Sequence, residues 1–404
     1  MKIESKTTIL DLNMDVLDII FSNFYWEKDK LNFAKAHPHL SAAFVHHSRK
    51  KYKEIRTVDR DWEFILKWLG TNVTSLRDKN CRNDVAQTNQ MLELAGNYCP
   101  NVEVIEFHVS EENIKIVEDN LVKLRKLNYI ILRGQIINME NIFKILKTFQ
   151  KLRRMALPNC YLPNLVPMNS LENLEDLQFV DLMDSDIKLF HNLWKNLKCL
   201  RTLTYPSTLN ILSKHCEQLE YLKLYNYQYF GKSMFAHFPK LKRLKILSCD
   251  DNDAYFHGKY NNQLETLEFP RGSFTTAKTA RRIAKLKALK TLRSKYMDSR
   301  CIRYIARMSL EKLILWELEQ NDLLILLREC KTLRWLHLES LNLDKDGLDT
   351  LLDILKSNGF QPENPFVLCL ECKQLRTSII NKLTSCSNAK LLDVQRSSYK
   401  FILP

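Results

Sequence analysis

The sequence of 404 residues contains only 8 glycines and 11 prolines. Collagen needs a glycine at every third position, and flexible linkers are rich in both residues, so neither class of protein fits. No apolar run approaches the ~18 residues that a membrane-spanning helix needs. The first residues, MKIESKTTILDLNMD, also lack the apolar stretch of a secretion signal. We therefore expect a protein of the cytoplasm or the nucleus that makes no membrane contact.

Sequence motifs of common enzyme sites are missing as well. The chain has no GxGxxG, no phosphate-binding GKS or GKT loop, no HExxH and no GxSxG. Its acidic residues are scattered without a paired signature. We expect no catalytic residue and no cofactor, and we expect the histidines between residues 37 and 47 to pack or face solvent.

Eleven cysteines occur, an odd number. Without a secretion signal, this argues against a disulfide framework and predicts that all eleven are reduced. Cys369 and Cys372 form a CxxC pair, but no second pair stands at zinc-finger spacing, so we expect a structural role and no bound metal.

The charge is strongly basic. The chain has 61 Lys and Arg against 47 Asp and Glu, a net charge of +14. Residues 1–50 hold seven basic and six acidic residues, so +13 belongs to the remaining 354 residues. Such a balance is typical of proteins with an acidic, phosphorylated or nucleic-acid partner, and equally of a soluble protein with a basic surface.

A three-position apolar pattern, L-x-x-L-x-L, recurs along most of the chain with a mean period of about 23 residues. Weaker copies follow at Leu368/Leu370 and Leu392/Val394. The clear copies are Val102/Ile105/Phe107, Leu127/Ile130/Leu132, Leu152/Met155/Leu157, Leu174/Leu177/Phe179, Leu200/Leu203/Tyr205, Leu219/Leu222/Leu224, Leu241/Leu244/Ile246, Leu264/Leu267/Phe269, Leu289/Leu292/Ser294, Leu310/Leu313/Leu315 and Leu333/Leu336/Leu338.

Each copy predicts one short strand followed by one helix. The last two positions are two residues apart and so point to the same side of a strand. Between copies the apolar spacing is helical, as in residues 344–359, where Leu348, Leu351, Leu352 and Leu355 share a face and Gly359 is a candidate helix stop. Neither element can bury its apolar face alone, so the units must stack into a continuous core.

This pattern resembles leucine-rich repeat proteins over roughly residues 70–404. The resemblance implies an α/β solenoid of about 12 repeats, a horseshoe with a parallel sheet on its concave face and helices on its convex face. Five cysteines refine it to the cysteine-containing repeat class, in which buried thiols pack at turns. Three of them lie three residues before the first position of a copy, namely Cys99, Cys216 and Cys330. The other two lie three residues after the last position of a copy, namely Cys160 and Cys249.

Residues 8–44 differ from the rest and predict two or three short helices. Two apolar series at helical spacing are separated by the polar break Glu27-Lys28-Asp29-Lys30. Together they make an apolar face too large for so small a body, so the repeats or a partner must cover it.

This stretch resembles an F-box of the variant found in insect F-box proteins with leucine-rich repeats. The matching residues are Leu12, Asp15, Val16, Leu17, Ile20, Phe21, Ser22 and Phe24, followed by Ala36-His37-Pro38-His39-Leu40, while Asn13 stands where the family has proline. The resemblance implies binding to a Skp-type adaptor through Leu12, Val16, Leu17, Ile20, Phe21, Phe24 and Leu31.

The residues that flank the two strand positions of each copy are expected to line the concave face. Several are basic or aromatic, which are side chains that binding hot spots favour, although solvated strand faces carry them too. The candidate substrate-binding residues are Tyr221, Lys223, Tyr225, Arg243, Lys245, Arg293, Lys295, Lys312, Trp316 and Trp335, with Thr291 and His337 on the same face.

By resemblance, the chain is the substrate-recognition subunit of a cullin–RING ubiquitin ligase of the SCF type. It has an F-box at residues 5–50, a connecting helix at 51–70 and repeats at 71–404. The adaptor would link it to the cullin and RING subunits, which carry the chemistry, while the repeats hold an acidic or phosphorylated protein substrate close to them. The alternatives are an interaction scaffold without a ligase role and, less favoured, a nucleic-acid-binding repeat protein.

Overall fold

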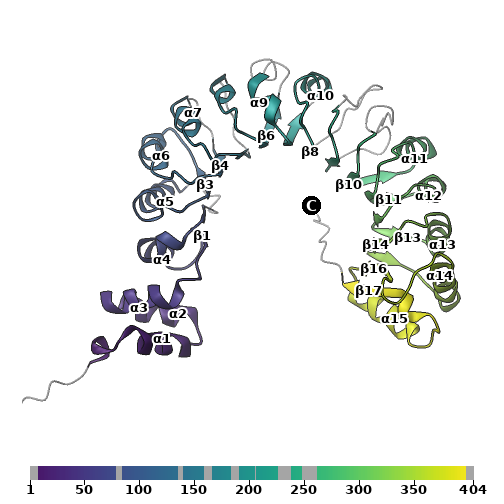
Figure 1. Ribbon diagram of the computed structural model, residues 1–404, viewed down its shortest axis with the longest axis horizontal. Helices are drawn as coiled ribbons and strands as arrows, with labels where there is room; N and C mark the ends of the chain where they lie inside the picture. The colour runs from purple at the N-terminus through teal and green to yellow at the C-terminus, as the bar shows by residue number, and fades with distance from the viewer. Residues whose placement is uncertain are drawn as a thin grey trace, which may run out of the picture. The chain divides into compact units, whose positions relative to one another are not determined.

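The structure, a computed structural model, describes residues 8–78, 84–134, 140–158, 166–182, 191–204, 206–225, 238–247 and 262–396 (Figure 1). The chain divides into two compact units, residues Met1–Leu174 and Glu175–Pro404. Both contain strand–helix repeats, and only the first contains the N-terminal helices.

The N-terminal helices confirm the expected small helical body. Asn13, at the position where the F-box family has proline, caps α1 by accepting a hydrogen bond from the backbone N–H of Val16 at 2.9 Å. Pro38 occupies the first turn of α3, where its missing N–H costs nothing. The elements are the short 3₁₀ helix η1 (Ile9–Asp11), α1 (Met14–Asn23), α2 (Glu27–Lys35) and α3 (Pro38–Ser48).

Aromatic rings fill the interior of this helical body. The Phe21 ring lies 5.2 Å from that of Phe33 and 5.6 Å from that of Phe44, measured between centroids. Phe44 also lies 6.2 Å from Phe64 of α4 (Trp62–Leu69), so α3 packs directly on the first repeat. Aromatic pairs at these distances each add about 0.5–1.5 kcal/mol beyond burial of their area.

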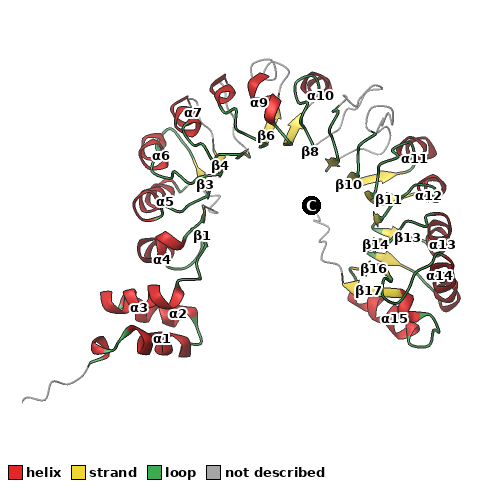
Figure 2. Cartoon of the chain, viewed as in Figure 1, coloured by secondary structure: helices red, strands yellow, loops and turns green. Residues whose placement is uncertain are grey.

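The first unit carries five parallel strands with helices on one side of them (Figure 2). The strands are β1 (Glu54–Arg56), β2 (Ser75–Arg77), β3 (Val104–His108), β4 (Tyr129–Arg133) and β5 (Arg154–Leu157). After α4 come η2 (Gly70–Asn72), α5 (Val85–Tyr98), α6 (Ile114–Leu121), α7 (Glu140–Lys147) and η3 (Val166–Ser170).

The repeats therefore begin at Glu54, and residues 51–70 are not the connecting helix that we expected. They form β1 and α4, and β1 pairs with β2 in the same parallel register as later strands. The apolar pattern was missed here because its third position is polar in the first two repeats. The hydroxyl of buried Thr57 donates to the carboxylate of buried Asp78 at 2.9 Å, which replaces an apolar contact with a hydrogen bond.

The second unit continues with the same architecture. Its strands are β6 (Asp176–Leu182), β7 (Cys199–Thr204), β8 (Tyr221–Leu224), β9 (Arg243–Ile246), β10 (Thr266–Phe274), β11 (Thr291–Met297), β12 (Lys312–Ile314), β14 (Trp335–Leu338), β16 (Phe366–Leu370) and β17 (Leu392–Arg396), with the small pair β13 (Glu317–Leu318) and β15 (Ser340–Leu341). Its helices are α9 (His191–Asn196), α10 (Pro206–Leu212), α11 (Ala277–Ile283), α12 (Ser299–Ile305), α13 (Gln320–Glu329), α14 (Lys345–Ser357), α15 (Lys373–Leu383) and η4 (Ala389–Leu391).

Strand register shows that the apolar pattern forms the core. The central position pairs in order along the second unit, through Leu177, Leu200, Leu222, Leu244, Leu267, Leu292, Leu313, Leu336 and Leu368. All of these leucines are buried, and each contributes about 1.5–3 kcal/mol by leaving water. The leucine-rich repeat fold class is thus confirmed.

Two copies of the pattern were assigned in the wrong register. The fifth copy is Leu197/Leu200/Thr202, because Leu200 pairs with Leu177 and Leu222 at the central position. Thr202 is buried and its hydroxyl donates to the Leu203 carbonyl, so a polar third residue disguised the true copy. Leu203 is only partly buried, and Tyr205 lies outside the described residues. In the last weak copy, Val394 pairs with Leu368, so Val394 occupies the central position that the pattern assigned to Leu392.

Helix α14 shows how the sequence sets the limits of a repeat. The Asp344 carboxylate caps its start by accepting from the Gly347 N–H at 2.6 Å. Gly359 follows its end with a φ of 79°, a backbone conformation that glycine adopts without steric cost. The expected stop at Gly359 is confirmed.

Three of the five turn cysteines are confirmed as buried thiols. Cys99 and Cys330 form the C-terminal caps of α5 and α13, and Cys216 follows α10. Burial raises the pKa of Cys99 to about 12 and that of Cys216 further still. The thiol of Cys330 donates to the carbonyl of Met308 at 3.2 Å. Cys160 and Cys249 lie outside the described residues.

Candidate interaction surfaces

Most of the candidate substrate residues lie on the side of the second unit's sheet that faces away from the helices, which we call the strand face. Tyr221 pairs with Arg243, and Lys223 pairs with Lys245. The Tyr221 row continues through Thr266, Thr291, Lys312 and Trp335, and the Lys223 row through Glu268, Arg293, Ile314 and His337. Side chains in one row share a face because successive residues of a strand alternate.

The other three candidates lie beyond the regular rows. Tyr225 follows β8, Trp316 follows β12, and Lys295 lies in β11 past Arg293. The N–H of Trp316 donates to the Lys295 carbonyl at 2.8 Å, and the Lys295 ammonium lies 5.4 Å from the Trp316 ring centroid.

Lysines lie over aromatic rings at several points of this face. The Lys312 ammonium is 3.8 Å from the Trp335 ring centroid, and the Lys223 ammonium is 4.5 Å from that of Tyr225. A cation over a ring is stabilised by about 0.5–1 kcal/mol when exposed. These contacts hold charged groups and rings side by side on this face.

One acidic residue that the sequence interpretation did not include reduces the charge of the face. Glu268, between Lys245 and Arg293 in the row, lies 2.9 Å from the first and 3.7 Å from the second. The Arg293 side chain is only 8% exposed, so it is largely a structural ion-pair partner rather than a contact residue. The sequence could have identified Glu268, because it lies between the two strand positions Leu267 and Phe269 of its own repeat.

Three cations of the strand face, Lys223, Lys245 and Arg201, lie close enough to act on one another. Burial, Lys245 and Arg201 together lower the pKa of the Lys223 ammonium. Burial together with Glu268 raises the pKa of the neighbouring Tyr221 hydroxyl to about 12, so the ring stays neutral. Arg243, beside Tyr221, is exposed and forms no ion pair within the described part of the chain. This cluster can accept an anionic group.

His337 lies in the Lys223 row on β14 but is fully buried. Burial, Arg293 and Lys312 lower the pKa of its imidazole to about 4, so the ring is neutral at physiological pH. It adds no charge to the face and packs beside the Trp335 ring, 5.8 Å away.

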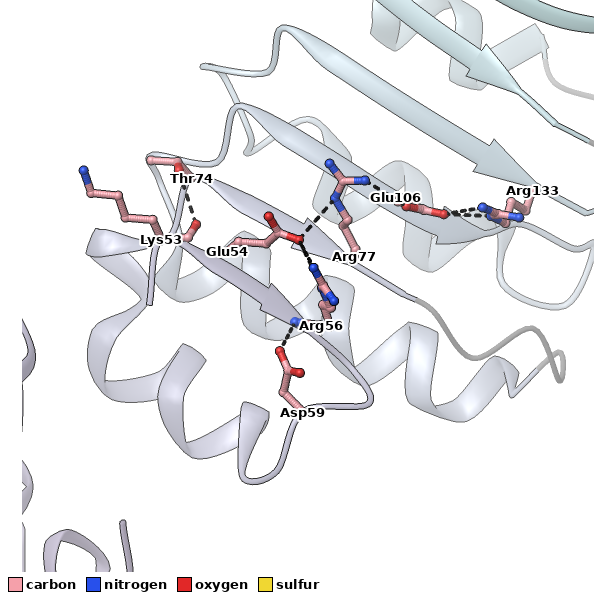
Figure 3. A network of polar contacts seen from close by, with 8 residues as sticks. All are labelled: Lys53, Glu54, Arg56, Asp59, Thr74, Arg77, Glu106 and Arg133. Carbon is pink, nitrogen blue, oxygen red and sulfur yellow. Dashed lines mark hydrogen bonds and ion pairs between the residues drawn. The ribbon is translucent and has the colours of Figure 1, made fainter. Parts of the chain in front are cut away.

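The strand face of the first unit has a different character. Figure 3 shows an alternating ladder in which Glu54 contacts Arg56 and Arg77, while Glu106 contacts Arg77 and Arg133. The carboxylate of Glu106 is nearly buried, and Arg133 holds one of its oxygens with two hydrogen bonds at 2.8 and 2.6 Å. Each arginine of this ladder is paired with a glutamate, so the ladder offers no comparable basic stripe.

The N-terminal helical body contains the seven candidate adaptor-binding residues, which the structure separates into two groups. Leu17, Phe21 and Leu31 are buried within the body and cannot touch a partner without unfolding it. Leu12, Ile20 and Phe24 are partly exposed, and Val16 is exposed. Helical periodicity identified one apolar series, but α2 and α3 cover most of it.

A second set of apolar side chains on this body was missed. Ile19 is 61% exposed, Tyr25 86% and Trp26 66%, and Ile9 and Leu10 are exposed to a lesser degree. They escaped notice because they lie off the internal helical face or in the turns that bound α1. The turn sequence Phe24-Tyr25-Trp26 is the signal that could have revealed them, since three consecutive aromatic residues cannot all face one core.

A polar network fastens the three helices together. The His47 ring of α3 contacts the Asp18 carboxylate of α1 at 2.7 Å through Nδ1, and the Lys30 ammonium of α2 at 3.2 Å through Nε2. Because an ammonium can only donate, Nε2 is the acceptor and Nδ1 carries the proton to Asp18. His47 therefore has a packing role, as expected, and also fixes the polar side of the body.

Two searches of the described residues bear on other kinds of site. No group of three His, Cys, Asp or Glu in them could hold a metal ion. None of the helices found in the same residues is long and apolar enough to cross a membrane.

Comparisons with known proteins identify no family. No protein-family model matches the chain, and no curated protein sequence does. Among solved structures, the chain is similar to an internalin (inlF) from Listeria monocytogenes, with 13% identity and a TM-score of 0.40 over 76% of this chain and 83% of that one. It is also similar to TLR13 in a complex with ssRNA13, with 15% identity and a TM-score of 0.40, over 73% of this chain and 42% of that one.

A third similar structure is an internalin C2 (inlC2) from Listeria monocytogenes. It shares 18% identity with a TM-score of 0.22, over 50% of this chain and 65% of that one. At such scores the fold assignment rests on the strand register and core of the chain itself.

Proposed function

We propose that this chain is a substrate receptor of an SCF-type ubiquitin ligase. In this proposal the N-terminal helical body docks on a Skp-type adaptor, which connects it to cullin and RING subunits. The strand face of the second unit then holds an acidic protein substrate. The chain itself performs no chemistry and acts by proximity.

The observation that carries the proposal is the apolar surface left open on the N-terminal body. Ile19 and Val16 lie one helical turn apart on α1, and Tyr25 and Trp26 follow in the adjoining turn. Exposed apolar side chains that gather on a small body are typical of a protein-binding site. The F-box resemblance supplies the kind of partner, and Phe24 and Ile20 beside them remain within reach of it.

Coexpression with a Skp-type adaptor, followed by size-exclusion chromatography, tests the proposal. The expected result is a stoichiometric complex that survives ~0.3 M salt, because the contact is mainly apolar and salt screens only charges. Separate elution of two folded proteins would remove the ligase assignment.

The structure also supports one alternative, an interaction scaffold whose helices simply cap the repeats. Phe44 of α3 packs on Phe64 of α4, which is what a cap would do. A scaffold would elute alone in the same experiment, and its N-terminal helices would matter only for stability.

A further inference from the structure

The positive charge of the chain is concentrated in two neighbouring repeats. Residues 271–310 contain twelve Lys and Arg but a single acidic residue, Asp298. Their net charge of +11 accounts for most of the +14 of the whole chain. Only Arg293 and Lys295 of this segment are among the strand-face candidates. Most of its other basic residues lie on the helices α11 and α12 and the turns after them, so the strand face cannot explain this charge.

A groove lies on the helix side of these repeats, where α11, α12 and α13 pack in sequence order. Its volume is about 520 Å³, within the range of ligand sites. Arg300, Arg303 and Arg307 line it at helical spacing, together with Tyr304 and the apolar side chains of Ala277 and Ile325.

The guanidinium groups of this groove are available to a ligand. Arg303 is exposed and forms no ion pair with any residue that the structure describes. Arg307 contacts Glu329 at 3.4 Å and Arg300 donates two hydrogen bonds to the Asp298 carboxylate, at 2.9 and 3.2 Å, while both arginines are more than 70% exposed. The single exposed contact of Arg307 contributes little, about 0–1 kcal/mol, and a guanidinium has five N–H donors, so Arg300 keeps donors for a second anion.

The remaining polar groups of the lining are fixed in place. The Arg281 guanidinium donates to the Tyr304 hydroxyl at 2.9 Å and lies 5.2 Å from the ring centroid. The Ser299 hydroxyl donates to the Asp322 carboxylate at 2.6 Å, which ties that negative charge to the wall. These groups are therefore in place before a ligand binds, and the side chains that a ligand would order are mainly the exposed arginines.

We propose that this groove binds a short acidic segment of a partner protein, whose Asp and Glu carboxylates pair with Arg300, Arg303 and Arg307. Guanidinium groups bind carboxylates through two parallel hydrogen bonds. The apolar lining beside them suits the side chains between the acidic residues of a peptide. The groove is on the opposite side of the repeats from the strand face, so both surfaces can be occupied at once.

A nucleic acid fits this groove less well than a peptide does. Proteins that bind single strands stack successive bases on several aromatic rings. Among the described residues of this lining, Tyr304 is the one aromatic residue, and Arg281 already covers a face of it. Asp322 and Glu329 of α13 also interrupt the positive track that a phosphate backbone would follow.

Fluorescence anisotropy with the full chain tests the proposal, with a labelled twelve-residue peptide rich in Asp and Glu as the probe. The variant Arg300→Glu/Arg303→Glu should weaken binding at least tenfold. The control Lys285→Glu/Lys287→Glu changes the net charge equally at two exposed positions of the same segment outside the groove, and should change affinity less than threefold. The single variant Arg303→Gln should lose about threefold and guards against a folding defect in the double variant.

Three results would overturn the proposal. One is absence of peptide binding at low salt. Another is an equal loss in the groove and control variants, which would show diffuse attraction to a basic surface. The third is that a single-stranded oligonucleotide of equal charge binds more tightly than the peptide, and that the groove variant loses this binding. That result would make nucleic acid the ligand.

Discussion

The ammonium of Lys312 lies 3.8 Å from the centre of the Trp335 ring, on neighbouring strands whose residues pair directly. This pair lies on β12 and β14, and the Lys223 cluster lies on β7, β8 and β9 of the same sheet. Between them Glu268 neutralises part of the charge. A partner that binds this face must therefore match alternating cations and rings rather than a uniform basic surface.

The electrostatic coupling within the Lys223 cluster can be measured directly. Replacing Lys245 with Met should raise the pKa of the Lys223 ammonium, because it removes one of the positive charges that lower it. Titration of isotope-labelled lysine side chains by NMR checks this. Lys295→Met, which removes a charge that does not act on Lys223, should leave its pKa unchanged; a shift of equal size there would contradict the account.

Buried His337 should make the stability of the chain depend on pH. Its pKa is about 4 in the folded state against 6.5 in the unfolded state, so below pH 6.5 the unfolded chain binds more protons. The free energy of unfolding should then fall by about 2 kcal/mol between pH 8 and pH 5 on account of this ring. Urea unfolding at both pH values measures the change.

The comparison for this experiment is His337→Gln, which cannot titrate. The variant should show a smaller fall in stability than the wild-type chain over the same pH range. Identical pH dependence in the two proteins would mean that folding does not lower the pKa of His337.

The cysteines should divide sharply in their reactivity. Cys372 is exposed and should react with a thiol reagent at pH 8 within minutes. Cys99 is buried with a pKa of about 12, so both access and the thiolate fraction oppose its reaction until the chain unfolds. Peptide mass mapping before and after addition of denaturant distinguishes the two, and rapid labelling of Cys99 in the native protein would contradict the fold.

The two kinds of apolar residue on α1 should respond differently to truncation. Phe21→Ala removes a fully buried ring and should destabilise the N-terminal body by about 3–5 kcal/mol. Ile19→Ala removes an exposed side chain and should change stability by less than about 0.5 kcal/mol. Denaturant unfolding of both variants provides the measurement, and a large loss in Ile19→Ala would show that this surface is already covered.

The apolar repeat predicted most of the fold, since a leucine ladder with a constant period leaves few ways to bury its side chains. It failed where a hydrogen bond replaced an apolar contact. Thr202 and the Thr57–Asp78 pair occupy core positions that periodicity alone reads as surface. The hydrogen-bond partners of these side chains come close to them only in the complete fold.

The candidate surfaces were predicted less completely. Alternation along strands placed Lys223 and Arg243 on the strand face correctly, because that relation is local. The same alternation places Glu268 in this row, but its ion pair with Lys245 depends on how the two side chains meet in the folded chain. Helical spacing could not distinguish buried Phe21 from exposed Val16, because both belong to the same apolar series of α1 and only the packing of α2 and α3 separates them.

The central claim is that the open apolar surface of the N-terminal body binds an adaptor. Titration calorimetry with a purified Skp-type adaptor tests it on three proteins: the wild-type chain, Val16→Glu/Ile19→Glu, and Ile380→Glu. Ile380 is 40% exposed on α15 and serves as the matched control for a charge placed on an exposed apolar residue. We predict that the wild type and Ile380→Glu bind with equal affinity, while the α1 variant, folded to the same extent, loses at least 100-fold. Undiminished binding by the α1 variant, or no binding by the wild-type chain, would contradict the account.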